Sequence, residues 1–95
     1  MTGKGVGKGG KYDYDQLRID CLRYLYHERQ KPSNRTMSKL MKHLGLQHSA
    51  SFNRVIYFLI GAGLVEEDMI GSTWLFTLTD KGILYLEKLQ ETQET

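Results

Sequence analysis

The spacing of apolar residues changes twice along the second half of this chain, and that change limits the folds open to it. From about residue 36 to residue 61 apolar side chains recur every three or four positions, the period of an amphipathic helix. Between residues 64 and 78 they follow two short strand-like runs, and the helical spacing then returns. The pattern predicts helix, tight turn, helix, two-stranded hairpin and helix.

The ends of the predicted helices carry suitable capping residues. Thr36 fits the N-cap of one helix and Gly45 its left-handed stop. Ser49 is expected to cap the next helix, which spans about residues 49–61, and Thr79 the last one. The helix over residues 49–61 places an apolar stripe inward, consisting of Phe52, Val55, Ile56 and Leu59.

A hairpin and a further helix complete the expected elements. Gly71-Ser72 fits a two-residue hairpin turn, and the side chains of the returning strand are expected to alternate between the two faces of the hairpin. Its Trp74, Phe76 and Leu78 are expected on one face, and Leu75 and Thr77 on the other. Helical spacing also predicts a first helix over residues 13–30, and we expect the polar C-terminal end to fray.

Length and composition favour a binding role over catalysis. Ninety-five residues suffice for one small core but not for a deep substrate cleft as well. No apolar run approaches the roughly 18 residues of a membrane span, and no secretory signal follows the N-terminal lysines. We therefore expect an intracellular protein with one folded domain over residues 12–92, a frayed end at 93–95, no membrane contact and no cofactor.

Residues 1–11 hold five glycines and three lysines, which predicts a flexible basic arm. The formal GxGxxG match within it does not indicate a nucleotide site, because no strand precedes it. Lys4, Lys8 and Lys11 belong either to an inert tail or to an arm that contacts DNA.

Charge is unevenly distributed. Residues 1–54 carry 11 Lys/Arg against 4 Asp/Glu, whereas residues 55–95 carry 2 against 7. The basic half includes the helices that would face a phosphate backbone, although a merely solvated surface is the alternative.

The outward side of the helix over residues 49–61 carries side chains suited to a major groove. Arg54 can form two hydrogen bonds with guanine and Asn53 two with adenine, while Ser51 and Tyr57 offer hydroxyls. Additional candidate DNA contacts, mostly to phosphates, are Arg35, Lys39, Lys42, Gln47, His48 and Ser49.

Three motifs in this order resemble winged helix-turn-helix regulators of the MarR, PadR and ArsR type, and small winged-helix proteins of archaea and their viruses. They are Leu40-Met41-x-x-Leu44-Gly45-Leu46, then Phe52-x-x-Val55-Ile56-x-x-Leu59-x-x-x-Gly63-Leu64-Val65, then Phe76-Thr77-Leu78-Thr79-Asp80-Lys81-Gly82-x-x-Tyr85-Leu86. The resemblance covers roughly residues 14–90. It implies an α+β, mostly helical fold with three or four helices and a short hairpin wing.

The resemblance also implies a function. A homodimer would read double-stranded DNA with the helix over residues 49–61 in the major groove. The first and last helices would supply the dimer contact. Regulators of this type can sense ligands, but the sequence shows no convergent polar pocket residues, so we predict no small-molecule effector. Candidate dimer residues are Tyr14, Arg18, Cys21, Leu25, Tyr85 and Leu89.

The hairpin departs from this family pattern. Glu66, Glu67 and Asp68 occupy its first strand, and no basic residue lies between Arg54 and Lys81. Carboxylates are repelled by phosphates, so we expect the wing to point away from DNA or to contact it only through Ser72 and Thr73.

Other functions stay open at this point. A winged helix used for protein contacts would dock through Tyr57, Phe58, Met69 and Ile70, and an architectural protein would bind DNA without sequence preference. An enzyme or metal site is disfavoured, because successive strand carboxylates alternate faces and the histidines lack paired ligand spacing. Cys21 is the single cysteine, expected in the core, with an intersubunit disulfide as the alternative.

Overall fold

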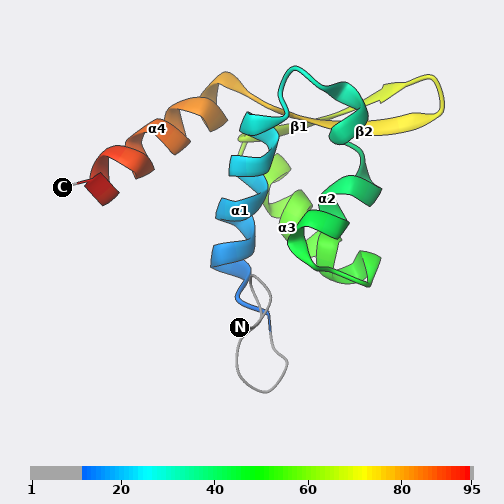
Figure 1. The fold of residues 1–95 in the computed structure, drawn as a ribbon, viewed down its shortest axis with the longest axis horizontal. Coiled ribbons are helices and arrows are strands. Elements are labelled where there is room, and N and C mark those ends of the chain that lie inside the picture. Colours follow the sequence, from blue (N-terminus) through cyan, green and yellow to red (C-terminus); the bar gives the residue numbers. More distant parts are fainter. Residues whose placement is uncertain (1–11, 95) are drawn as a thin grey trace.

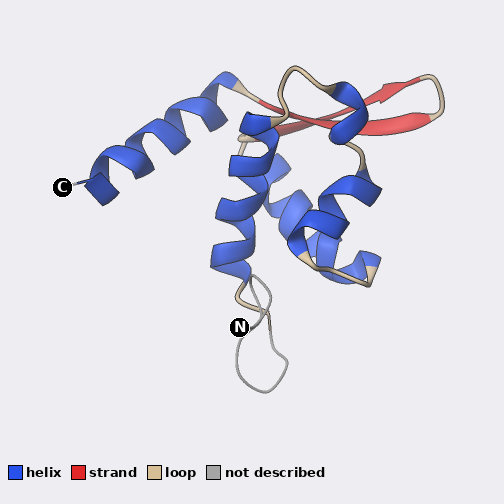
Figure 2. Cartoon of the chain, viewed as in Figure 1, coloured by secondary structure: helices blue, strands red, loops and turns tan. Residues whose placement is uncertain are grey.

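The computed structural model describes residues 12–94, and the elements follow the predicted order. Figure 1 shows α1, α2 and α3 grouped beside the hairpin, with α4 running out to one side and the hairpin tip to the other. Figure 2 distinguishes the helices from the two strands. The elements are α1 (Tyr14–His27), the 3₁₀ turn η2 (Pro32–Asn34), α2 (Met37–Leu44), α3 (Ser49–Gly61), β1 (Val65–Ile70), β2 (Thr73–Leu78) and α4 (Asp80–Glu94).

Capping groups set the ends of α1 and α2. The Asp13 carboxylate accepts from the Gln16 backbone N–H at 3.2 Å, and the Thr36 hydroxyl accepts from that of Lys39 at 3.4 Å. Gly45 ends α2 with a φ of 73°, a left-handed conformation that glycine adopts without strain. The Thr36 and Gly45 predictions are confirmed, whereas α1 ends at His27 rather than near residue 30.

The cap predicted for α3 is wrong by one residue. His48 occupies the N-cap position and its side chain forms no capping bond, while Ser49 is already helical. His48 nevertheless begins the helix through its carbonyl, which accepts from the N–H groups of Ser51 and Phe52. The first turn of α3 therefore lacks a side-chain cap.

One hydrophobic core joins the helices to the sheet. The predicted inward stripe of α3 is confirmed, because its four members are at most 1% exposed. The Phe52 ring packs edge-on against Phe76 of β2, with ring centroids 5.6 Å apart. From α1 the core receives Leu17, Cys21, Leu22 and Leu25.

β1 and β2 pair antiparallel and form the wing, which we define as residues 65–78. The Gly71-Ser72 turn is confirmed, with Gly71 at a φ of 65°. The strands pair in a regular register, so the side chains of β2 alternate between the two faces as predicted, but burial does not follow the faces: Leu75 is 5% exposed, whereas Trp74 is 48% exposed. Leu75 lies where Thr36 forms a β-bridge with β2, while Trp74 lies farther out beside Met69, beyond the core.

Hydrogen bonds from the first turn of α4 fix its start against the end of α3. The Thr79 hydroxyl donates to Gly63 O at 2.7 Å and accepts from the Gly82 N–H, which confirms Thr79 as the cap. The Lys81 ammonium donates to Ala62 O at 2.9 Å. Beyond this turn Leu86 is buried, and the helix extends to Glu94.

No helix within residues 12–94 is long and apolar enough to cross a membrane.

Candidate nucleic-acid interface

The burial of one side of α3 turns a polar side outward. Asn53, Arg54 and Tyr57 are exposed, and Ser51 is half-buried. The helix backbone is held by its four buried side chains, so these groups project from a fixed support. The structure thus places on one helix four of the residues that the sequence suggested for DNA contacts, namely Ser51, Asn53, Arg54 and Tyr57.

Arg54 has an aromatic neighbour that the sequence did not reveal. Its guanidinium carbon lies 5.4 Å from the ring centroid of Tyr14, which in turn lies 6.1 Å from the ring of Tyr12. A cation over a ring face is attracted and partly oriented by it. Tyr12 is also the first described residue of the chain. The predicted contacts of the N-terminal arm, Lys4, Lys8 and Lys11, lie outside the described residues.

The beginning of α3 is open to solvent. Gln47, His48 and Ser49 are exposed, and no side chain caps the helix there. Unpaired N–H groups and the positive end of the helix dipole favour an anion at such a position.

α2 presents its two lysines away from the core. Lys39 and Lys42 are exposed, whereas Leu40 and Leu44 on the same helix are fully buried. The amphipathic spacing of this short helix leaves both ammonium groups accessible to a ligand.

The prediction that Arg35 contacts DNA is wrong, because its side chain points inward. It is 8% exposed, and its Nη1 donates to Phe76 O at 3.0 Å and to the Thr77 hydroxyl at 2.6 Å. The Arg35 carbonyl also accepts from the Phe76 N–H at 3.1 Å. Arg35 therefore ties the chain before α2 to β2 and has no guanidinium to offer to a phosphate. Its partners lie 41 and 42 residues away in sequence, so no local pattern could have indicated them.

The wing is acidic and exposed. Glu66, Glu67 and Asp68 are all exposed, and none of them has an ion-pair partner among the described side chains. The apolar residues Met69, Ile70 and Trp74 are 46%, 59% and 48% exposed near the hairpin tip. The wing thus differs in charge from α2 and the start of α3.

The prediction of a dimer contact is also wrong for two residues, Cys21 and Leu25. Cys21 and Leu25 are 0% exposed within a single chain, because α1 is covered by α2, α3, α4 and β2. Burial, and secondarily the Asp20 carboxylate, raise the pKa of the Cys21 thiol to about 12. In this fold Cys21 is a core residue and cannot reach a second subunit for a disulfide.

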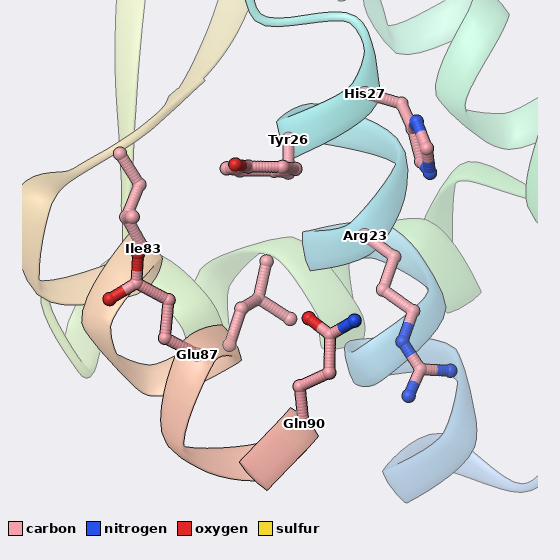
Figure 3. Close-up of a pocket in the computed structure, with 7 residues that line it drawn as sticks. Arg23, Tyr26, His27, Ile83, Glu87 and Gln90 are labelled. Carbon is pink, nitrogen blue, oxygen red and sulfur yellow. The ribbon is translucent and has the colours of Figure 1, made fainter. Parts of the chain in front are cut away.

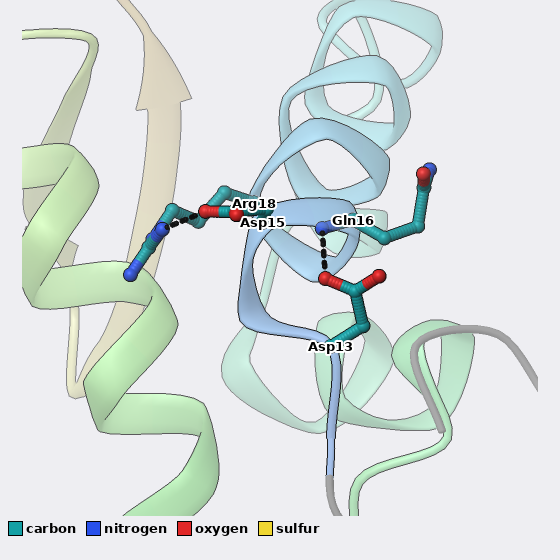
Figure 4. Close-up of polar contacts among 4 residues, drawn as sticks. All are labelled: Asp13, Asp15, Gln16 and Arg18. Atoms are coloured by element: carbon teal, nitrogen blue, oxygen red, sulfur yellow. Dashed lines mark hydrogen bonds and ion pairs between the residues drawn. The ribbon is translucent and has the colours of Figure 1, made fainter. Parts of the chain in front are cut away.

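The other predicted dimer residues retain accessible surface. Tyr85 is 43% exposed, and Tyr14, Arg18 and Leu89 are partly exposed. Figure 4 shows Arg18 beside Asp15, with which its Nη1 forms an ion pair at 2.7 Å. The same guanidinium stacks on the ring of Phe58 from α3, with 3.9 Å between the guanidinium carbon and the ring centroid.

Grooves flank α4 where it leaves α1. One, of about 360 Å³, separates Arg23, Tyr26 and His27 of α1 from Ile83, Leu86, Glu87 and Gln90 of α4 (Figure 3). Another, of about 480 Å³, has a largely apolar lining that includes Phe58 and Tyr85. Within residues 12–94, no cluster of three or more His, Cys, Asp or Glu side chains could hold a metal ion.

The helix order, the glycine-ended turn before α3 and the hairpin after it define a winged helix-turn-helix fold. The crystal structure of SSV1 F-93 is similar to this chain, with a TM-score of 0.59 and 26% sequence identity. The similarity covers 82% of this chain and 86% of F-93. No protein-family model matches the sequence, and no curated protein does.

Proposed function

We propose that this protein binds double-stranded DNA in a sequence-specific manner and regulates transcription by occupying its site. The observation that carries this role is the exposed side of α3, where Asn53, Arg54 and Tyr57 project from a helix held by four buried residues. The likeness to SSV1 F-93 supports the fold that presents this helix. An intracellular location belongs to the same role.

Each element would have a distinct contact. α3 would enter the major groove, with Arg54 bonding guanine O6 and N7 and Asn53 bonding adenine N6 and N7. Phosphates would be held by the open start of α3 and, without sequence preference, by Lys39 and Lys42. This role needs no catalytic step and no cofactor.

A homodimer through α1 and α4 would place two copies of α3 on a two-fold symmetric site. Its contact surface would include Tyr14, Arg18, Tyr85 and Leu89 from the sequence-based prediction. Phe58 and Leu84 are further candidates for this surface, because they are 54% and 57% exposed. Phe58 lines the apolar groove and Leu84 lies on α4. Exposed apolar residues at this density are typical of a protein contact. No small-molecule effector is part of the proposed role.

The test is selection from a randomised duplex pool, followed by fluorescence anisotropy at two salt concentrations. Salt-sensitive binding that enriches a two-fold symmetric sequence is the expected result. Salt-sensitive binding without enrichment would contradict sequence specificity and indicate an architectural protein. Absence of binding at low salt would contradict DNA binding altogether.

A further inference from the structure

The outer edge of β1 has no strand beside it among the described residues. The sheet contains only β1 and β2 in that part of the chain, and the far edge of β2 is bridged by Thr36. A strand edge of this kind presents unpaired backbone donors and acceptors.

The direction of these backbone groups follows from the hydrogen bonds of β2. The Phe76 N–H donates away from β1, to Arg35 O, so the opposed pair Glu67 and Phe76 is a non-hydrogen-bonded pair. The N–H and C=O of Glu67 therefore point to the free edge, as do those of Met69 two residues later. The bond that the Met69 N–H donates to the adjacent Asp68 carboxylate, at 3.0 Å, is consistent with this direction.

The two faces of this edge differ chemically. Glu66 and Asp68 lie on one face of β1, while the other carries Glu67 and the exposed cross-strand pair Met69 and Trp74. An open groove of about 650 Å³ runs along the edge between the three carboxylates and Ile60 in the last turn of α3. The surroundings are thus acidic on one face and partly apolar on the other.

We propose that the outer edge of β1 binds an extended, basic segment of a partner protein, which adds a third strand to the wing. Backbone hydrogen bonds to Glu67 and to the Met69 carbonyl would supply affinity, as in other cases of strand addition, and the Met69 N–H would exchange its bond to Asp68 for one to the added strand. Lysine or arginine at alternate positions of the segment would face Glu66 and Asp68. The residues between them would be apolar and would cover Met69 and Trp74.

Charge determines this choice of partner. Three exposed carboxylates that have no ion-pair partner within residues 12–94 attract a cationic polypeptide and repel a nucleic acid. No described strand of this chain has the required basic and apolar alternation, so a second copy does not supply it through β1 or β2. The site is independent of DNA binding by α3, and each can fail without the other.

The first test uses the unmodified full chain and a fluorescein-labelled peptide of alternating lysine and valine. We expect saturable binding by anisotropy, a change in the emission of Trp74, the single tryptophan, and amide shifts at Glu67 and Met69 by NMR. A matched peptide should not bind when it is methylated on the backbone nitrogens that would donate to β1. It keeps its charges but cannot pair as a strand. Equal binding of the methylated peptide, or shifts confined to α3, would overturn the proposal.

Charge reversal on the protein gives the second test. The variant E66K/E67K/D68K should bind the lysine–valine peptide about tenfold more weakly or worse, whereas E87K/E91K on the exposed side of α4 should change affinity by less than about twofold. Retained binding by the wing variant would contradict the proposed site. Amide shifts at Glu67 and Met69 on addition of a DNA duplex alone would show that the wing faces nucleic acid, and would also overturn it.

Discussion

The α2–α3 region and the wing are built on the same core but present opposite charges. α2 and α3 expose Lys39, Lys42 and Arg54, whereas the wing exposes three carboxylates and no basic residue. Both are joined by the Phe52–Phe76 ring contact and by the Arg35 bonds to β2. The difference teaches that the fold fixes where a surface lies, while the side chains on it determine what it can bind.

The largest expected effect comes from a substitution at Gly82, in the first turn of α4, where this helix packs against the ends of the two strands. An added Cβ at Gly82 would lie 2.3 Å from Leu64 O and 2.7 Å from a Leu78 methyl, so Gly82→Ala must displace backbone. We expect it to lower the free energy of unfolding by about 3 kcal/mol in urea titrations. Gly61→Ala is the matched control, because nothing lies within 4 Å of its added methyl, and it should be neutral or slightly stabilising. Equal losses for the two variants would contradict the close approach at Gly82.

The next largest effect is expected from removing the Arg35 side chain, which connects the α2–α3 region to the wing. Arg35→Ala removes both guanidinium bonds to β2 but keeps the backbone bond from Phe76, and should cost about 2 kcal/mol of unfolding free energy. Lys42→Ala, at an exposed position, should change stability by less than about 0.5 kcal/mol. If Arg35→Ala were as mild as Lys42→Ala, the side chain would not be holding the wing.

Within the basic region, base reading and phosphate contact can be told apart. Arg54→Ala should weaken DNA binding by about 1–2 kcal/mol and relax the preference at one base position. Lys42→Ala should weaken binding to all sequences alike and reduce the salt dependence. Anisotropy against the selected duplex and its single-base variants measures both. Uniform weakening by Arg54→Ala would remove its assigned role.

The smallest expected effect concerns the wing and DNA. The neutral variant Glu66→Gln, Glu67→Gln, Asp68→Asn should change DNA affinity by no more than about 0.5 kcal/mol, because carboxylates far from phosphates contribute little. The same anisotropy titration at two salt concentrations checks this. A clear rise in affinity would mean that the wing lies against the DNA backbone.

Much of the fold could be predicted because its signals are local. The stripe from Phe52 to Leu59, the Thr36 cap and the glycine at position 71 each depend on a few neighbouring residues. Helix periodicity and turn chemistry report such features directly.

The remaining features depend on contacts between distant segments. Leu75 is buried at the point where Thr36 pairs with β2, and the Arg35 side chain is turned inward by its bonds to Phe76 O and the Thr77 hydroxyl. Cys21 and Leu25 appeared suitable for a dimer contact only because the number of elements packed on α1 cannot be read from its own sequence. Among the candidate DNA contacts, helical spacing correctly indicated which side of α3 is exposed, but not that Tyr14 lies beside Arg54.

The most direct test of the contrast between the two regions is an amide chemical-shift map of the full chain titrated with its selected duplex. We predict shifts along α3 around Asn53 and Arg54 and at Lys39 and Lys42 of α2, with Glu67 and Met69 of β1 unchanged. Shifts on the wing without shifts on α3 would contradict the account, because the acidic hairpin would then be the surface that meets DNA.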